Sequence, residues 1–120
     1  MRGSAYDSLP DFVPKVPNLN DDYQQAVDDL TKSIELKPNY AEAYGERGKA
    51  YNNLGDYQQA IKDCTKAIEL KPDYADAYYY RGFSWAKLND FGLSSNDYKT
   101  AARLGNNAAQ NVLIRAGIQW

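Results

Sequence analysis

The sequence predicts an all-α fold, an α-α superhelix in which antiparallel helix pairs stack into a short solenoid. Two observations lead to this prediction. The stretch Asp-Tyr-Gln-Gln-Ala at residues 22–26 recurs at residues 56–60, an offset of 34 residues, and 17 of the 23 positions in 22–44 are identical to those in 56–78. An internal period of this length is typical of arrays in which each unit is one helix–turn–helix.

The repeat and its turn residues predict six helices, over about residues 22–37, 41–54, 57–70, 75–88, 91–104 and 106–117. Asn20 or Asp21 is the predicted N-cap of the first helix. Asp56 and Asp90 are the predicted N-caps of two later helices, because their side-chain oxygens can accept hydrogen bonds from the free amides of a first turn. Gly105 is predicted to end the fifth helix in a left-handed conformation.

The two ends of the chain differ in character. We expect the last helix to cover the open end of the array, and its residues available for burial are Val112, Leu113 and Ile118. Residues 7–20 stand where the array needs a first helix, but their prolines forbid a regular one: Pro10, Pro14 and Pro17. We therefore expect 1–20 to be extended or disordered, with 1–4 resembling an expression-vector leader. Residues 21–117 are expected to form the folded domain.

The helix at 22–37 therefore lacks its usual partner, which leaves several interpretations open. The N-terminal segment packs onto this helix, or it lies in a groove of its own or a neighbouring chain. Alternatively, two chains meet through the uncovered helix and form a homodimer. Disorder of residues 1–20 is the simplest alternative, although Phe12 and Val13 are larger apolar residues than disordered tails usually carry.

The residue types at the repeat positions resemble the tetratricopeptide pattern of a large aromatic, Leu-Gly, Tyr, Ala, an aromatic and Pro. One unit reads Tyr44, Arg47, Gly48, Tyr51, Ala60, Cys64 and Pro72, and the next reads Tyr78, Arg81, Gly82, Trp85, Ser94 and Tyr98, with Asn106 at the place of Pro. The glycines let paired helices approach closely, and both arginines replace the family Leu, with stems expected to snorkel. The resemblance covers residues 22–117 and implies about two and a half repeats plus a C-terminal capping helix.

In this family the first helix of each unit lines a concave groove in which partners lie, so the resemblance implies groove positions here. They are Glu42, Gly45, Lys49, Asn52 and Asn53 in one unit, and Asp76, Tyr79, Phe83, Ala86 and Lys87 in the next. Tyr79 and Phe83 are one helical turn apart and share a face, and aromatic side chains are enriched in binding hot spots. The alternative is that both rings pack against the neighbouring helix or the cap.

Some family members clamp the C-terminal carboxylate of heat-shock chaperones with Lys, Arg and Asn side chains. The corresponding positions here hold Gly45, Glu46, Lys49, Asp76 and Tyr80. A carboxylate would meet acidic neighbours at these positions, so we expect no binding of chaperone tails.

The composition argues against other functions. His is absent and Cys64 is the single cysteine, so the usual zinc ligand sets and the commonest general base near neutral pH are missing. A net charge of −2 gives no reason to expect nucleic acid, and no apolar run reaches the length of a membrane span.

The predicted function is therefore the binding of a protein or peptide partner, without enzymatic activity, cofactor or metal. The alternative is a self-association or structural module in which another chain completes the N-terminal unit. The location of the protein is not fixed by the sequence, and the cytoplasm is favoured.

Overall fold

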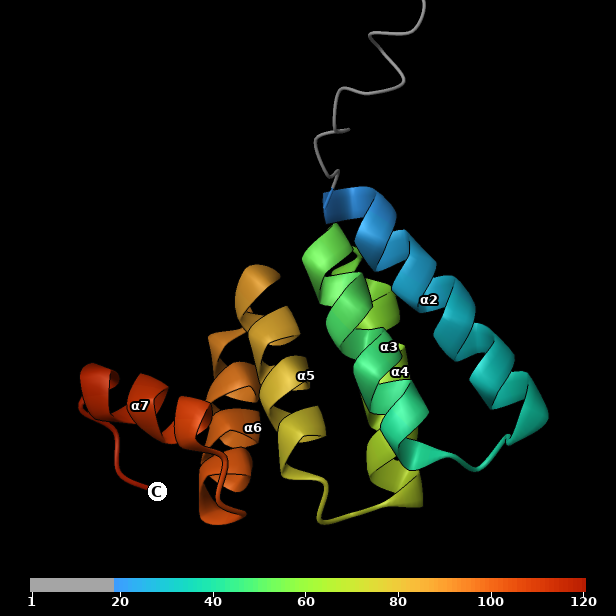
Figure 1. Cartoon of the computed structure of the whole chain (residues 1–120). Helices are drawn as coiled ribbons and strands as arrows, with labels where there is room; N and C mark the ends of the chain where they lie inside the picture. The colour runs from blue at the N-terminus through green and yellow to red at the C-terminus, as the bar shows by residue number, and fades with distance from the viewer. Residues whose placement is uncertain (1–18) are drawn as a thin grey trace, which may run out of the picture.

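The computed structural model describes residues 19–120, so the predictions for residues 1–18 lie outside the described part of the chain. This part contains helices and no strand, in the order α2 (Leu19–Leu36), α3 (Ala41–Leu54), α4 (Tyr57–Leu70), α5 (Ala75–Lys87), α6 (Phe91–Arg103) and α7 (Asn107–Ala116). Figure 1 shows the helices side by side from α2 to α7, with α3/α4 and α5/α6 as antiparallel pairs. The predicted all-α superhelix is confirmed.

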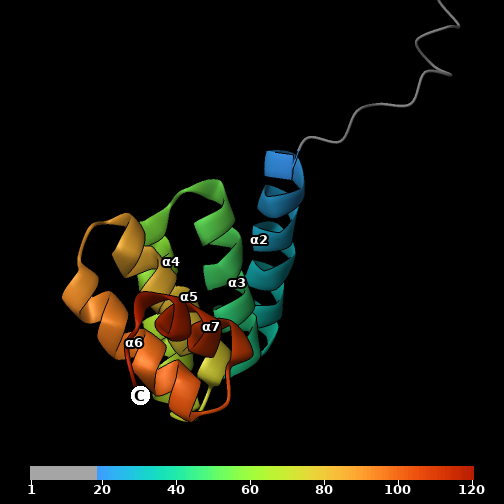
Figure 2. The same ribbon diagram turned by 90° about the vertical axis from the view of Figure 1, so that its left-hand side faces the viewer.

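The helices pack in chain order, and α3 also contacts α5. The two first helices of the complete units therefore lie next to each other. Figure 1 shows α2 and α7 at opposite ends of the array. Figure 2 looks along the array from the α7 end and shows α2 at the edge beside α3. The face made by α3 and α5 is where the predicted partner-binding residues lie.

Most helix boundaries agree with the predictions within one residue, and the first helix is the exception. It begins at Leu19, so Asn20 and Asp21 lie in its first turn, and the predicted N-cap at these residues is wrong. Acidic side chains still favour this position, because they complement the positive end of the helix dipole. The predicted caps Asp56 and Asp90 are confirmed: they accept hydrogen bonds from the backbone amides of residues 59 and 93 at 3.3 and 3.2 Å.

Small residues bring the paired helices close together. A Cβ atom added to Gly48 would lie 2.6 Å from the Cys64 Sγ and 3.2 Å from the carbonyl oxygen of Ala60. One added to Gly82 would lie 3.1 Å from the ring of Tyr98. The predicted close approach at both glycines is confirmed, and it explains why the helix pairs pack tightly with little bulky aliphatic side chain between them.

The C-terminal end closes as predicted. Gly105 has a φ of 99°, which ends α6 in the left-handed region, and the Asn106 side chain accepts a hydrogen bond from the backbone amide of Ala109 at 2.8 Å to start α7. Leu113 is 1% exposed, and Val112 and Ile118 pack beside it on the cluster of α6 and α7 residues. Helix α7 therefore covers the apolar face of the last pair.

Candidate functional site

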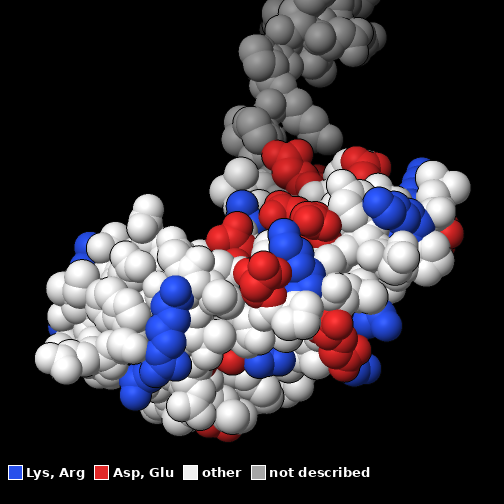
Figure 3. Space-filling model, turned by 90° about the horizontal axis from the view of Figure 1, so that it is seen from below, with Lys and Arg blue, Asp and Glu red and all other residues white. Residues whose placement is uncertain are grey.

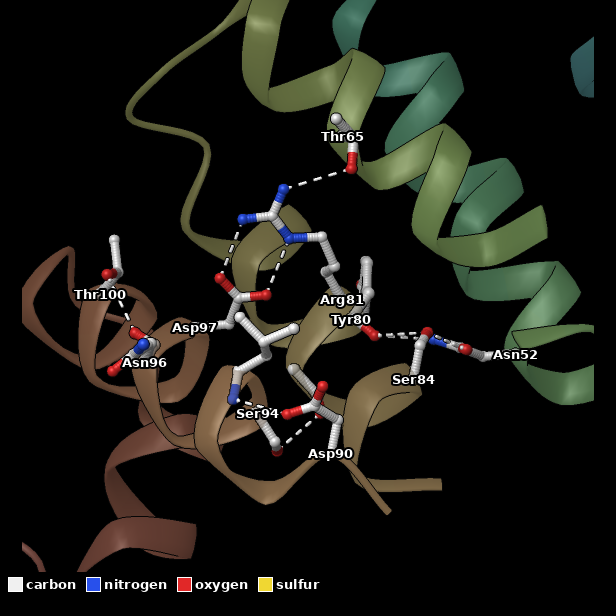
Figure 4. A network of polar contacts seen from close by, with 12 residues as sticks. Asn52, Thr65, Tyr80, Arg81, Ser84, Asp90, Ser94, Asn96, Asp97 and Thr100 are labelled. Atoms are coloured by element: carbon white, nitrogen blue, oxygen red, sulfur yellow. Dashed lines mark hydrogen bonds and ion pairs between the residues drawn. The ribbon is translucent and has the colours of Figure 1, made fainter. Parts of the chain in front are cut away.

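The two arginines that replace the family Leu form the same ion pair in both units. Arg81 donates from Nε and Nη2 to the two carboxylate oxygens of Asp97 at 2.8 and 2.9 Å, and from Nη1 to Thr65 Oγ1 at 3.2 Å (Figure 4). Arg47 makes the equivalent bonds to Asp63, at 2.7 and 2.8 Å, and to Thr31 at 3.1 Å. Each guanidinium thus joins its helix to the second helices of its own unit and of the preceding one.

We expected the stems of these arginines to snorkel toward solvent. Instead, buried aspartates hold both guanidinium groups. The side chains of Asp63 and Asp97 are only 4% and 9% exposed, and bidentate hydrogen bonding raises the pKa of both arginines above the usual value. The sequence could have indicated these ion pairs, because the two aspartates are themselves 34 residues apart and each follows its arginine by 16 positions.

A second polar contact fixes the angle between α3 and α5. The Asn52 Nδ2 donates to the carbonyl oxygen of Tyr80 at 3.0 Å, and the Ser84 hydroxyl lies 2.5 Å from Asn52 Oδ1 and 3.1 Å from the same carbonyl (Figure 4). Asn52 is 7% exposed. Its amide group is therefore occupied by contacts between the two helices that form the groove wall.

A pocket of about 170 Å³ opens between these two helices, and we call it the α3–α5 pocket. It is lined by Lys49, Asn52, Asn53, Tyr79, Tyr80 and Phe83. Five of the eight predicted partner-binding residues thus come together at one place. Tyr80 was not among the eight, although the run of three tyrosines at 78–80 already indicated more aromatic residues than the family pattern requires.

Aromatic rings and two lysines shape the rim of the pocket. Phe83 meets the ring of Tyr57 edge-on at a centroid distance of 6.4 Å, and Tyr79 meets Tyr80 at 5.9 Å. Lys49 Nζ lies 5.9 Å from the Tyr80 ring centroid, and Lys87 Nζ lies 5.4 Å from that of Phe83. Both ammonium groups are within reach of a cation–π attraction, so positive charge flanks an apolar floor.

The Tyr80 hydroxyl stays protonated, so the apolar floor of the α3–α5 pocket carries no charge. Burial, followed by the nearby Glu46 and Asp76 carboxylates, raises the pKa of the Tyr80 hydroxyl well above its usual value. The phenol is therefore neutral across the physiological range. The pocket presents ring faces, an amide and two flanking ammonium groups to a ligand.

The other two predicted residues lie away from the pocket, at the starts of their helices. Glu42 accepts from Lys71 Nζ at 3.4 Å, and its pKa is lowered by hydrogen bonding to the backbone and then by this lysine. Asp76 accepts a 2.8 Å hydrogen bond from Asn106 Nδ2. Both carboxylates thus belong to contacts between a helix start and a neighbouring loop.

Two further groove positions implied by the resemblance lie elsewhere. Gly45 is buried beneath the Tyr74 ring, whose Cε2 would lie 2.6 Å from an added Cβ. Ala86 lines a separate cavity of about 330 Å³ between α5, α6 and α7, beside Phe91 and Val112. Neither residue lines the α3–α5 pocket.

The rings of Tyr79 and Phe83 have neighbours inside the fold and also line the α3–α5 pocket. Each packs on a neighbour inside the fold, Tyr79 on Tyr98 at a centroid distance of 5.6 Å and Phe83 on Tyr57. Each also contributes to the wall of the pocket. Packing against the fold therefore fixes the position of both rings in the pocket wall.

Charge is unevenly spread over the surface seen in Figure 3. Acidic side chains gather over the N-terminal helices, while the C-terminal half is mostly uncharged apart from a stripe of Lys and Arg. Within residues 19–120, no group of three or more side chains could hold a metal ion. In the same part of the chain, no helix is both long and apolar enough to cross a membrane.

Comparisons with known proteins agree with this architecture. The family model of the tetratricopeptide repeat matches residues 41–74. The Arabidopsis OM64 TPR domain has 30% sequence identity and a TM-score of 0.76, with 79% of this chain and 80% of that chain covered. Among curated proteins, none matches the chain significantly.

Two other similar structures hold peptides. The first TPR of Spaghetti (RPAP3), bound to the HSP90 peptide SRMEEVD, has 28% identity and a TM-score of 0.74, covering 80% of this chain and 78% of that one. The second TPR domain of human RPAP3, in complex with the HSP70 peptide SGPTIEEVD, has 29% identity and a TM-score of 0.72, covering 81% and 82%.

Proposed function

Because the chain belongs to the tetratricopeptide repeat family, we propose that it is a protein-interaction module that binds a peptide segment of a partner along α3 and α5. The observation that carries this proposal is the convergence of Lys49, Asn53, Tyr79 and Phe83 on one pocket. Family members with similar structures hold peptides, which supports the same use here.

The pocket favours a peptide that inserts one apolar side chain. Its volume of about 170 Å³ suits a single aliphatic or aromatic group, and the walls are the rings of Tyr79, Tyr80 and Phe83. Aromatic residues of this kind supply most of the energy of peptide contacts. Asn53 is exposed and is the amide available to the peptide backbone, since that of Asn52 is occupied.

An acidic tail is disfavoured, and this distinguishes the chain from the peptide-bound structures it resembles. Those structures hold peptides ending in EEVD. Here the carboxylates of Glu46 and Asp76 lie near enough to raise the pKa of Tyr80 in the pocket, and Lys49 and Lys87 oppose them. We therefore propose a neutral or basic peptide ligand, with SRMEEVD and SGPTIEEVD binding weakly or not at all.

The test begins with a phage-displayed library of random peptides, panned on the full chain. The selected peptide is then titrated calorimetrically into the wild type, Phe83→Ala and Phe91→Ala. Phe91 is the matched control, since it is 65% exposed and lies on α6 outside the α3–α5 pocket. We expect Phe83→Ala to weaken binding roughly tenfold or more, because it removes a central aromatic contact, and Phe91→Ala to leave binding unchanged.

Two results would contradict the proposal. One is equal affinity of the selected peptide for the wild type and Phe83→Ala. The other is a map of backbone amide shifts, measured by NMR during the titration, that falls on the outer faces of α4 and α6 instead of α3 and α5.

Self-association is the second candidate function. The observation that favours it is a groove beside α2 that residues 19–120 leave unfilled, where a complete unit would hold its first helix. This surface adjoins the α3–α5 pocket, because Lys49 and Asn53 line both.

A further inference from the structure

A groove of about 210 Å³ between α2 and α3 has the shape of a helix site that residues 19–120 leave unfilled, and we call it the α2–α3 groove. It is lined by Tyr23, Ala26, Leu30, Glu46, Lys49, Ala50 and Asn53. A shift of 34 residues maps Ala26 and Leu30 onto Ala60 and Cys64. Those two residues pack against Gly48 of α3. The α2 wall of the groove is thus the surface that receives a first helix in a complete unit.

The α3 wall leads to the same conclusion. The same shift maps Glu46 and Ala50 onto Tyr80 and Ser84 of α5. In the complete unit these two residues contact Asn52 of the preceding first helix. Both walls of the α2–α3 groove therefore match the surroundings of α3, with the helix itself missing.

The residues before α2 are unsuited to supply this helix. Helix α2 runs through positions 21 and 22, which correspond in the repeat to Gly55 and Asp56. At Gly55 and Asp56 the chain turns back from α3 to α4, so α2 lacks the reversal that would lead into a paired helix. In addition, the sequence has Pro14 at the repeat position of Gly48, and proline disrupts a helix interior.

The repeated ion pair recurs at fixed positions along the chain. Arg47 and Arg81 each pair with the aspartate 16 residues later. The next arginine of the series is Arg115. The preceding aspartate of the series is Asp29, and residue 13 is Val13 instead of arginine.

Asp29 and Arg115 thus hold the same repeat positions as the paired aspartates and arginines. Both are exposed, and neither forms an ion pair within residues 19–120. The Asp29 carboxylate accepts a 3.0 Å hydrogen bond from the Gln25 side chain on the same helix.

We propose that α7 of a second copy lies in the α2–α3 groove, with its Arg115 paired to Asp29. Helix α7 packs on α6 through Ala109 and Leu113, which leaves Arg115 and the 63% exposed Ile114 on its outer side. The register that pairs Arg115 with Asp29 places Ala116, the repeat counterpart of Gly48, beside Ala26 and Leu30. The helix has 10 residues and is about 15 Å long, shorter than the 14-residue α3 that lies in the equivalent site.

The charges of the two ends are complementary. The side chains of α2 comprise five acids and one base, a net charge of 1 − 5 = −4. Those of residues 91–120 comprise three bases and one acid, a net charge of 3 − 1 = +2. Opposite charges steer the two ends toward each other and exclude contacts between like ends.

Exposed large apolar side chains also concentrate near the two ends. Leu19 and Leu36 on α2 are 62% and 89% exposed, and Trp120 beside α7 is 40% exposed. The contact joins different surfaces of the two copies, so it does not close at two chains, and further copies add in the same way.

The test is sedimentation velocity of the full chain over a concentration series. The variants are Asp29→Arg, Arg115→Asp and an equimolar mixture of the two, with Asp28→Arg as the control. Asp28 lies next to Asp29, but its repeat equivalents Lys62 and Asn96 are not in the ion pair, so the control makes the same change of charge.

We expect the wild type and Asp28→Arg to form species larger than dimers as concentration rises, and high salt to reduce them. Each single variant places like charges at the contact and should weaken association roughly tenfold or more. The mixture should restore association, since every contact between unlike chains then joins an arginine to an aspartate.

The proposal is overturned if the wild type stays monomeric at every concentration. It is also overturned by a dimer that does not grow further, or by a mixture that associates no better than the single variants. Peptide binding by the α3–α5 pocket is measured separately on the same variants. Because neither Asp29 nor Arg115 lines that pocket, loss of association with retained peptide binding separates the two proposals.

Discussion

Removal of the Asp97 carboxylate tests whether the repeated ion pair is an important source of stability. In Asp97→Ala the Arg81 guanidinium keeps only the hydrogen bond to Thr65, and its side chain is 21% exposed. Removing one partner of a fully buried pair costs about 3–5 kcal/mol. Because water reaches part of this guanidinium, we expect the low end of that range, about 3 kcal/mol of unfolding free energy.

The double variant Arg81→Leu with Asp97→Ala separates the contact from the cost of a stranded charge. Leu is the residue that the family pattern has at this position, and an apolar replacement of both partners is often neutral. We expect the double variant to lie within about 1 kcal/mol of the wild type, so the two changes are strongly non-additive.

Urea unfolding followed by circular dichroism measures all members of this cycle at neutral pH. The control is Glu42→Ala, which breaks the Lys71–Glu42 pair, whose side chains are 43% and 50% exposed. An exposed pair contributes about 0.2–1 kcal/mol. The reasoning is refuted if Asp97→Ala costs no more than Glu42→Ala, or if the double variant is less stable than Asp97→Ala.

The remaining predictions concern packing and the buried thiol. Gly48→Ala should lower the free energy of unfolding by about 1–3 kcal/mol in thermal unfolding, since the new Cβ lies 2.6 Å from Cys64 Sγ. Gly92→Ala should raise it by up to about 1 kcal/mol, because its Cβ meets nothing nearer than 3.9 Å. Equal effects of the two variants would contradict this. Burial raises the pKa of Cys64 from 9.0 to about 12, so a thiol reagent should label it only as fast as the protein unfolds, and immediate labelling of the native chain would contradict this. Burial also raises the pKa of Tyr98 from 10.0 to about 12. Cys64 and Tyr98 therefore favour the folded state fully below pH 9 and progressively less from pH 9 to pH 12. The urea midpoint should fall over this interval, and a constant midpoint would contradict the argument.

The repeat made the local structure predictable. Asp56, Asp90 and Gly105 act through their own backbone neighbours, so their roles follow from residue type and position. Gly48 and Gly82 were predictable for a related reason, because a position that recurs as glycine in both units indicates close helix contact. The start of α2 was missed, since the prediction assumed that the first unit obeys the repeat frame.

Contacts between units were harder to predict. The burial of Gly45 under Tyr74 and the use of Asn52 as a bridge depend on the angle between α3 and α5, which the 34-residue period does not specify. The aspartate partners of Arg47 and Arg81 depend on which face each helix turns inward. That information was in the sequence as a second series at the same period, 16 residues downstream.

The bridge at Asn52 also bears on how the α3–α5 pocket binds its ligand. A free asparagine in the groove could hydrogen-bond a peptide, but here both ends of the Asn52 amide are engaged by Tyr80 and Ser84. Breaking these bonds would leave buried polar groups unpaired, which costs about 1–3 kcal/mol for each group. A peptide therefore gains more by leaving the bridge intact. The bridge holds the two helices at a fixed angle, so the rings of Tyr79 and Phe83 are in place before a ligand arrives, and less ordering free energy is lost on binding.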